Sequence, residues 1–371
     1  MLLLVTIFSV FLHVNIVPVY SKCVEDEQSS LLQLKQSLTF ESFSSPTINS
    51  WSSSTDCCSW VGVTCNEGSV VSLDLSGQFI SGGINNSSSL FELQHLESLN
   101  LAANRFSGTQ IPSGIGKLTN LSYLNLSNAG FARQIPVEIS RLTRLVTLDI
   151  STLYFTMIPL KLENPNLKML VQNLSEIKEL YLDGVNISAQ GKEWCQAISS
   201  SLPNLRVLSM SDCYLQDCPD SSLLKLQSLS IIRLDYNPFF ASVPEFFAYF
   251  TNLTSLHLSS CGLNGQFPEK IFQVPTLQTL DLSNNELLQG YWPEFHPNGS
   301  LRSLLLSGTK FSGTLPDSIG NLKMLSKIDL SFCNFSGSIP SSMKTLLNWF
   351  IWTFHQTTST DQFHHSAGPR I

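Results

Sequence analysis

The first four of the chain's nine cysteines lie close together and carry the most distinctive chemistry. They are Cys23, Cys57, Cys58 and Cys65. Thiols can bind zinc or oxidise to disulfides, and a zinc site is disfavoured because these four lack a paired C-x2-C arrangement. Residues 1–21 begin with an apolar run and end in Val19-Tyr20-Ser21, the small-residue pattern of a cleaved signal peptide. An exported chain meets an oxidising compartment, so disulfides are expected.

A second group combines acidic, basic and aromatic side chains between residues 179 and 257. We call it the recognition cluster, and it comprises Glu179, Tyr181, Asp183, Arg233, Asp235 and His257. This mixture is typical of a surface that binds a protein or peptide. The chain has no G-x-S-x-G, H-E-x-x-H or G-x-G-x-x-G motif. We therefore expect a binding protein rather than an enzyme, without cofactor or metal.

Charge and hydropathy narrow the classes of partner. The net charge of −7 gives no basic footprint for nucleic acid. After residue 21 no window is apolar for the ~20 residues that a membrane-spanning helix requires, so we expect no membrane span in this chain.

Repeats must position these residues. Residues 277–346 contain three variants of one template, as in "LRSLLLSGTKFSGTLPDSIGNL" and "LSKIDLSFCNFSGSIPSSMKTL". The second leucine of each unit, which we call the ruler residue, recurs at steps of 26, 25, 24, 32 and 28 residues and then five times at 24. The eleven ruler residues are Leu73, Leu99, Leu124, Leu148, Leu180, Leu208, Ile232, Leu256, Leu280, Leu304 and Ile328.

The template L-x-x-L-x-L-x-x-N/C-x-L is that of a leucine-rich repeat. Its L-x-L is a short strand with leucines pointing inward and the x residues outward, and stacked units bury the leucines. A buried Asn or Cys then satisfies or avoids the backbone polar groups of the turn. These residues are Asn104, Cys213, Asn237, Cys261, Asn285 and Cys333. The fold class is therefore an α/β solenoid, a superhelix with a parallel sheet on its concave face, where the recognition cluster would lie on adjacent coils.

The chain divides into four parts. Residues 1–21 are the signal peptide, 22–67 an N-terminal cap, 68–346 about eleven repeats, and 347–371 a tail without repeats. In the cap, Leu31, Leu34 and Leu38 predict one apolar helix face. The repeats are irregular over 155–205, where two helical-looking insertions precede Leu180 and Leu205. In the tail, Trp352 stands where a twelfth ruler residue belongs, and we expect no strand there.

The cysteines of the repeats are expected to behave differently from those of the cap. Cys261 and Cys333 occupy the buried turn position, so free core thiols are expected. Cys195 lies in an insertion and could reach Cys213 or Cys218, and we favour a Cys195–Cys213 disulfide. The odd total leaves at least one thiol unpaired in a monomer.

Nine N-x-S/T sequons predict a secreted glycoprotein. They are Asn85, Asn86, Asn120, Asn125, Asn173, Asn186, Asn252, Asn298 and Asn334. Asn125 is unusual because it lies in the outward strand column, where a glycan would block nearby ligand contacts.

The unit ending F-x-G-x-(I/L)-P, as in residues 106–112 and 335–340, resembles the plant-specific class of leucine-rich repeats. The segments "ELYLDGVNISAQGKEWCQAISSSLPNLRVLSMSDC" and "CGLNGQFPEKIFQVPTLQTLDLSNN" resemble plant receptor-like proteins of the tomato Verticillium-wilt-resistance type. The cap spacing, with Trp51 and Trp60, resembles that of plant leucine-rich-repeat receptors, which implies the pairs Cys23–Cys57 and Cys58–Cys65.

This resemblance implies an extracellular module of plant defence signalling. It would bind a pathogen-derived or apoplastic protein or peptide on its concave face and signal through co-receptor kinases, either secreted or at the cell surface. Full-length relatives are single-pass plasma-membrane proteins, so the resemblance also implies that this chain is a truncated receptor. The alternative is a soluble inhibitor of fungal cell-wall-degrading enzymes, similar to polygalacturonase-inhibiting proteins. The missing C-terminal cysteine cap and the specific insertions disfavour it.

Overall fold

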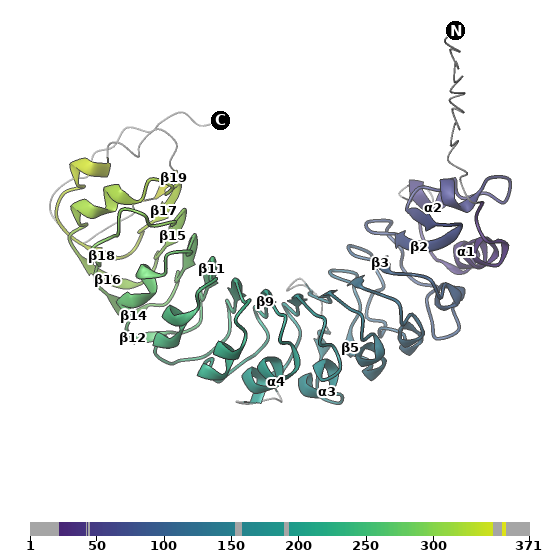
Figure 1. Ribbon diagram of the computed structural model, residues 1–371, viewed down its shortest axis with the longest axis horizontal. Coiled ribbons are helices and arrows are strands. Elements are labelled where there is room, and N and C mark those ends of the chain that lie inside the picture. Colours follow the sequence, from purple (N-terminus) through teal and green to yellow (C-terminus); the bar gives the residue numbers. More distant parts are fainter. Residues whose placement is uncertain are drawn as a thin grey trace, which may run out of the picture.

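The computed structural model describes residues 22–41, 43, 45–152, 158–188 and 193–343, and the backbone of 351–353. The expected signal peptide lies outside these residues. The coils stack into an open arch, with a line of strands along its inner side (Figure 1). The predicted solenoid with a parallel sheet on the concave face is confirmed.

The concave sheet has thirteen strands in the order β1-β2-β3-β4-β6-β8-β9-β10-β11-β13-β15-β17-β19. From β2 onward neighbouring strands are parallel, and β1 pairs antiparallel to β2. The bounds are Val63–Asn66 (β1), Ser69–Asp74 (β2), Ser98–Asn100 (β3), Tyr123–Asn125 (β4), Thr147–Asp149 (β6), Glu179–Tyr181 (β8), Val207–Ser209 (β9), Ile231–Arg233 (β10), Ser255–His257 (β11), Thr279–Asp281 (β13), Ser303–Leu305 (β15), Lys327–Asp329 (β17) and Ile351–Thr353 (β19).

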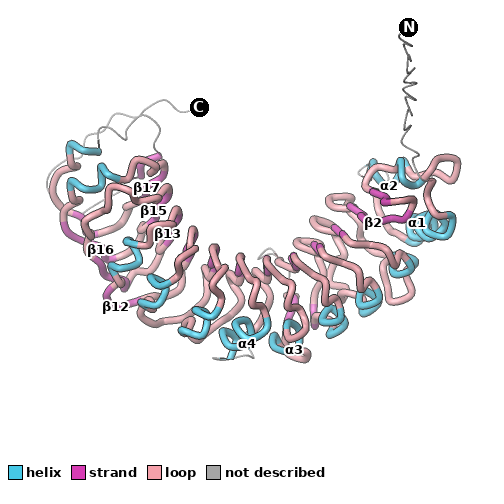
Figure 2. Tube along the Cα trace, viewed as in Figure 1, coloured by secondary structure: helices cyan, strands magenta, loops and turns pink. Residues whose placement is uncertain are grey.

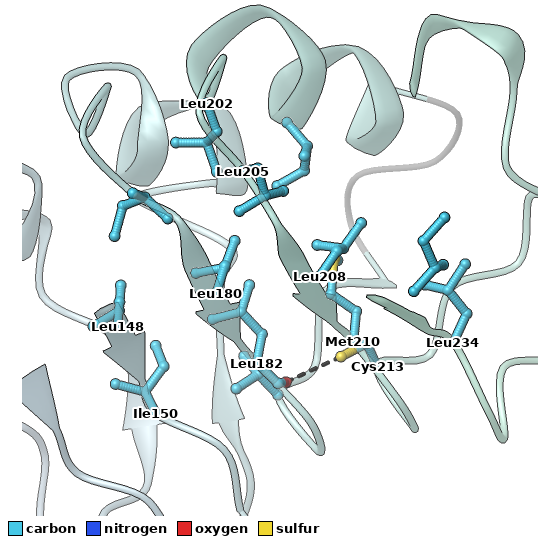
Figure 3. Close-up of a cluster of buried hydrophobic side chains, with 14 of the residues drawn as sticks. Leu148, Ile150, Leu180, Leu182, Leu202, Leu205, Leu208, Met210, Cys213 and Leu234 are labelled. Carbon is cyan, nitrogen blue, oxygen red and sulfur yellow. Dashed lines mark hydrogen bonds between the residues drawn. The ribbon is translucent and has the colours of Figure 1, made fainter. Parts of the chain in front are cut away.

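The ruler residues set the register of this sheet. All eleven face one another across successive strands, from Leu73↔Leu99 to Leu304↔Ile328. Each is at most 1% exposed, and together with the next inward leucine of each strand they form the core column drawn in Figure 3. Burial of one such side chain stabilises the fold by about 1.5–3 kcal/mol, which explains why the column continues through the irregular units.

Two smaller sheets lie beside the first. β12 (Asn264–Gln266), β14 (Leu287–Gly290), β16 (Lys310–Gly313) and β18 (Asn334–Phe335) form a parallel four-stranded sheet. β5 (Arg133–Gln134) pairs with β7 (Leu160–Lys161). These strands follow the turn of each unit, and the leucine template does not predict them.

Short helices form the convex side (Figure 2). Five 3₁₀ helices follow a proline that provides the N-cap, and its fixed φ near −70° suits the start of a helix. The 3₁₀ helices of the coils are Ser89–Glu92 (η3), Ser113–Lys117 (η4), Val137–Arg141 (η5), Ser221–Lys225 (η7), Glu245–Tyr249 (η8), Glu269–Gln273 (η9) and Asp317–Asn321 (η10). The two insertions form α3 (Leu167–Val171) and α4 (Glu193–Ser201).

In three units a buried asparagine holds the turn, and Asn237 shows how. Its Nδ2 donates to the carbonyls of Met210 and Leu234 at 2.8 and 2.9 Å, and its Oδ1 accepts the backbone N–H groups of Cys213 and Leu215, both at 3.0 Å. One side chain thereby satisfies backbone groups of two successive coils. Asn104 and Asn285 make the same kind of contact.

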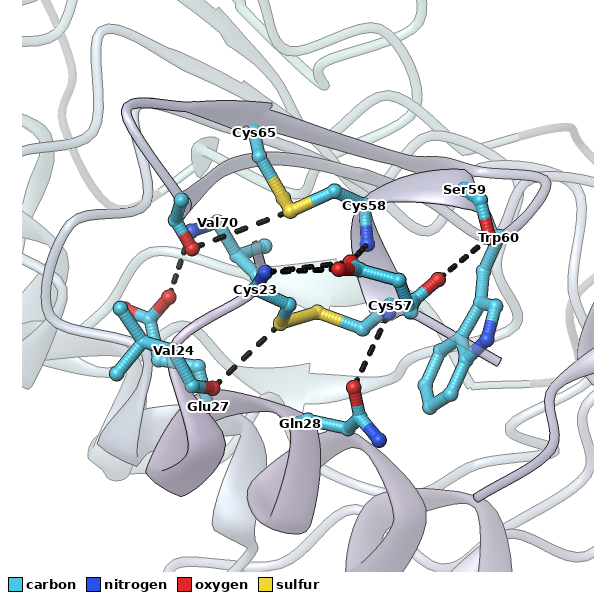
Figure 4. Close-up of a disulfide and its surroundings, with 12 residues drawn as sticks. Cys23, Val24, Glu27, Gln28, Cys57, Cys58, Ser59, Trp60, Cys65 and Val70 are labelled. Atoms are coloured by element: carbon cyan, nitrogen blue, oxygen red, sulfur yellow. Dashed lines mark hydrogen bonds between the residues drawn. A yellow bond between two sulfur atoms is a disulfide. The ribbon is translucent and has the colours of Figure 1, made fainter. Parts of the chain in front are cut away.

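The N-terminal cap is α1 (Glu25–Ser37), α2 (Pro46–Ser50) and the 3₁₀ helix η2 (Cys57–Ser59), closed by the β1–β2 hairpin. Disulfides Cys23–Cys57 and Cys58–Cys65 fasten it, as the resemblance implied (Figure 4). Trp51 and Trp60 stack with ring centroids 5.4 Å apart. The cap therefore covers the first ruler residue with apolar and disulfide-linked groups.

Glu27 joins the cap to the first coil, and its loss should loosen that joint. The carboxylate is 6% exposed, accepts the Val70 N–H at 2.6 Å and contacts His95 Nδ1 at 2.9 Å. Glu27→Ala leaves the Val70 N–H buried without an acceptor, so we expect a loss of about 1–3 kcal/mol in the free energy of unfolding. Urea unfolding measures it, and the exposed Glu25→Ala should change it by less than about 0.5 kcal/mol. Equal losses in both variants would contradict this assignment.

The expected Cys195–Cys213 disulfide is wrong: the two residues are not bonded to each other, and their sulfur atoms have different partners. The Cys213 thiol fills the turn position and donates to the Leu182 carbonyl at 3.0 Å (Figure 3), so it points into the core. Cys195 instead accepts the Asp220 N–H through its sulfur at 3.4 Å. Cys261 and Cys333 are buried free thiols, as predicted.

The expectation that no strand follows Leu346 is also wrong. The backbone of β19 continues the concave sheet, with Trp352 opposite Ile328 in the register of a twelfth ruler residue. The expectation rested on the missing leucines, whereas the pairing uses backbone groups that any residue carries.

Among the described residues, no helix is long and apolar enough to cross a bilayer.

Candidate ligand-binding face

The concave sheet places the six residues of the recognition cluster on one face but not all on adjacent coils. Glu179, Tyr181 and Asp183 belong to the β8 coil, Arg233 and Asp235 to the β10 coil, and His257 to β11. The β9 coil separates the first set from the second, and its Ser209 stands in register between Tyr181 and Arg233. The expectation of adjacent coils is thus correct only for the β10 and β11 residues.

Tyr181 and Glu179 form the first part of the face. The Tyr181 hydroxyl donates to the Glu179 carboxylate at 3.4 Å, and the Thr147 hydroxyl lies 3.5 Å from the same oxygen. Burial, followed by the Glu179 charge, raises the pKa of Tyr181 to about 12. The phenol therefore stays neutral and offers a hydrogen-bonding edge and an aromatic surface.

Asp183 connects the β8 coil to the β9 coil. Its carboxylate accepts the Ser209 hydroxyl at 2.8 and 2.9 Å and the Ser211 N–H at 2.6 Å. Burial raises the pKa of Asp183, while the bonds from the two serines and the Arg233 charge oppose that rise. The side chain is therefore a fixed acidic group beneath the surface that Tyr181 and Arg233 present.

Asp235 repeats this arrangement one coil later. Its Oδ1 accepts both the N–H and the hydroxyl of Ser259 at 2.9 Å, and its Oδ2 lies 3.4 Å from the Ser211 hydroxyl. In regular coils the serine at this column instead bonds an aspartate of its own strand, as Ser283 does with Asp281. Asp183 and Asp235 thus each link their own coil to a neighbouring one, and these hydrogen bonds preorganise this part of the face.

Arg233 and His257 provide the basic and titratable groups. Arg233 is exposed and stands opposite His257 in the β10–β11 register. Asp281 follows in register on β13, on the other side of His257. Asp281 and Asp149 are not members of the recognition cluster, yet their charges raise the pKa of His257 and of Tyr181 respectively.

The ligand atoms of Asp235, His257 and Asp281 lie within 4.8 Å of one another. Both carboxylates already accept hydrogen bonds from serines, and the Arg233 charge acts on His257. An added cation would meet that positive charge, which disfavours a metal ion between these three groups.

His257 should titrate below its ordinary pKa of 6.5. Burial lowers the pKa most and Arg233 lowers it further, against the carboxylates of Asp235 and Asp281. Because the folded-state pKa is depressed, the associated stability is present above about pH 6.5 and is lost as the pH falls through the folded-state pKa. NMR of the imidazole protons measures the midpoint of the His257 titration. His257→Gln should remove this titrating resonance and the loss of stability that accompanies it as the pH falls. A midpoint at or above 6.5 would refute this expectation.

The predicted glycosylation sites lie mostly on exposed turns of the coils. Asn125 is half-buried on β4, as its column predicted, where its Nδ2 donates to the Tyr123 hydroxyl at 3.1 Å. A glycan on this nitrogen would have to break that contact. Occupancy of the nine sites stays a prediction.

Models of known families match most of the chain, from the N-terminal cap through the repeats. A leucine-rich repeat N-terminal domain matches residues 24–66, a leucine-rich repeat region matches 70–289, and single leucine-rich repeats match 300–322 and 324–346. The chain belongs to the leucine-rich-repeat family. This family assignment agrees with the ruler residues, the turn asparagines and the disulfide-linked cap.

The relatives of this leucine-rich-repeat chain are plant receptor-like proteins. It is 32% identical over 265 residues to Receptor-like protein 6 of Arabidopsis thaliana, covering 66% of this chain and 26% of the relative. It is 32% identical over 275 residues to Receptor-like protein EIX1 of Solanum lycopersicum, covering 67% and 25%. The chain therefore spans about a quarter of the length of these relatives.

Solved structures confirm the leucine-rich-repeat architecture. The Arabidopsis receptor kinase HAESA, in complex with the peptide hormone IDA and the co-receptor SERK1, superposes with a TM-score of 0.69 at 23% identity, covering 89% of this chain and 62% of HAESA. The TDR receptor superposes with a TM-score of 0.60 at 28% identity, covering 72% and 44%. The leucine-rich-repeat family and the receptor-like relatives of this chain are ligand-binding modules rather than enzymes.

Proposed function

We propose that this leucine-rich-repeat chain is the extracellular recognition part of a receptor-like protein and binds a protein or peptide ligand on its concave face in plant defence signalling. The pair of inter-coil links made by Asp183 and Asp235 carries the proposal. It fastens together the coils that carry Tyr181, Arg233 and His257, and a preorganised aromatic and charged surface loses little entropy on binding.

The relatives support this assignment. PEPR1, crystallised with AtPEP1, shares 27% identity with the chain at a TM-score of 0.52, and HAESA was crystallised with both a peptide and a co-receptor. We extend this pattern to the present chain, with a pathogen-derived or apoplastic ligand on the concave face and a co-receptor kinase as the signalling partner.

The concave face is tested by comparing two triple variants of the secreted protein. The face variant carries Tyr181→Ala, Arg233→Ala and His257→Ala. The convex control carries Lys225→Ala, Tyr249→Ala and Lys270→Ala, all on 3₁₀ helices of the outer side. We expect the face variant alone to lose about tenfold or more in capture of ligand from secreted fungal proteins or apoplastic fluid. Equal capture by both variants would exclude the face. Inhibition of fungal polygalacturonase by the wild-type chain would instead support the inhibitor function.

A further inference from the structure

Three of the five unpaired cysteines have a structural role. Cys213, Cys261 and Cys333 occupy the turn position, and each thiol donates to a carbonyl of the preceding coil at 3.0–3.2 Å. Forming a disulfide would remove this donor from a buried carbonyl, which is costly. Cys195 and Cys218 lie outside the turn positions. Cys218 donates to the Ser242 carbonyl at a longer 3.7 Å, and the Cys195 sulfur accepts rather than donates.

Contacts on both sides of Cys218 bring it to Cys195. Trp194 Nε1 donates to the Asp217 carbonyl at 3.3 Å, and the Asp220 N–H donates to the Cys195 sulfur at 3.4 Å. Two consecutive residues of α4 thus hold the chain one residue before and two residues after Cys218. Two residues of chain span at most about 7 Å, so Cys218 lies close to Cys195.

We propose that Cys195 and Cys218 form a third disulfide when the chain folds in the secretory pathway. Both thiols lose their protons and one electron each as the S–S bond forms. The oxidant is a disulfide of the export compartment, such as oxidised glutathione or an oxidoreductase, which is reduced to two thiols by exchange. The bond would join the insertion helix α4 to the segment before η7.

Burial supports bond formation during folding rather than after it. Cys195 is 1% exposed, and burial raises the pKa of both thiols, that of Cys218 to about 12. Exchange requires a thiolate, so the folded dithiol should react slowly with an added oxidant. Oxidation while the coil is still open avoids this barrier.

The location gives the bond a consequence for the concave face. α4 lies between β8 and β9, and Cys218 lies between β9 and β10. The bond would therefore tie the convex side of the β8 and β9 coils, which Asp183 links on the concave side. The proposal of this disulfide does not depend on which ligand the chain binds.

Peptide mapping of the intact secreted protein tests the bond. The protein, exported from plant or insect cells, is denatured and alkylated without reduction. Trypsin cleaves after Arg206 and separates Cys195 from Cys213 and Cys218. Chymotrypsin cleaves after Tyr214 and separates Cys213 from Cys218. We expect one linked peptide containing Cys195 and Cys218, lost on reduction, while Cys213, Cys261 and Cys333 are alkylated.

Two further samples serve as controls. In Cys218→Ser the Cys195 thiol should become alkylated, with the two cap disulfides unchanged. Protein refolded under reducing conditions should show all nine cysteines alkylated, and its Cys195 and Cys218 should stay a dithiol when oxidised glutathione is added to the folded chain. Recovery of Cys195 and Cys218 as separate alkylated peptides from the exported wild type, or of Cys195 linked to Cys213, would overturn the proposal.

Discussion

Asn237→Ala should lower the free energy of unfolding by about 2–5 kcal/mol, because several buried backbone groups lose their partners at once. The asparagine is fully buried and bonds two carbonyls and two N–H groups from successive coils. Alanine supplies neither donor nor acceptor, and water has no access to replace it. Urea unfolding of the secreted protein, followed by circular dichroism, measures the loss.

Asn204→Ala is the matched control for this experiment. Asn204 is exposed and makes a single bond to the Ser175 carbonyl at 3.0 Å, so its loss should cost no more than about 1 kcal/mol. If Asn237→Ala and Asn204→Ala lowered the free energy of unfolding equally, the turn residues would not hold neighbouring coils together.

Leu208→Ala should cost about 2–5 kcal/mol, the range for truncating a buried leucine. Leu208, the ruler residue of β9, is fully buried and lies beside Leu180 (Figure 3). In the register of the sheet it stands between Leu180 and Ile232. The cavity lies in the middle of a stack in which each coil contacts mainly its neighbours, so the damage should be local. Hydrogen exchange should quicken first in β8, β9 and β10 and only weakly in β2 and β17.

Leu287→Ala provides the comparison. This leucine on β14 is 57% exposed, and its truncation should change stability by less than about 0.5 kcal/mol. Uniform acceleration of exchange along the whole chain would show that the solenoid unfolds as one unit instead.

The leucine period was enough to predict the concave sheet, because burying a ruler residue requires every unit to adopt one register. It predicted the turns at Asn104, Asn237 and Asn285 for a similar reason, since a buried backbone group must find a partner. The cap helix followed from the one-sided spacing of Leu31 and Leu34. These features share a local and repeated cause.

The errors concern contacts without such a period. The second sheet and the β19 strand are held by backbone hydrogen bonds, which leave little trace in side-chain type. Sequence distance suggested Cys213 as the partner of Cys195, but the turn already uses that thiol. The six residues of the recognition cluster were identified by composition, whereas the links from Asp183 and Asp235 depend on which way each carboxylate turns between coils.

The constant step between Leu208 and Ile328 affects how the gene can gain or lose whole repeat units. Successive ruler residues there are 24 residues apart, and every join between coils uses the same parallel register. Unequal crossing-over within the gene could therefore delete or duplicate one whole unit and leave both new neighbours correctly paired. A lineage could change the length and contour of its concave face in a single generation without first repairing the core.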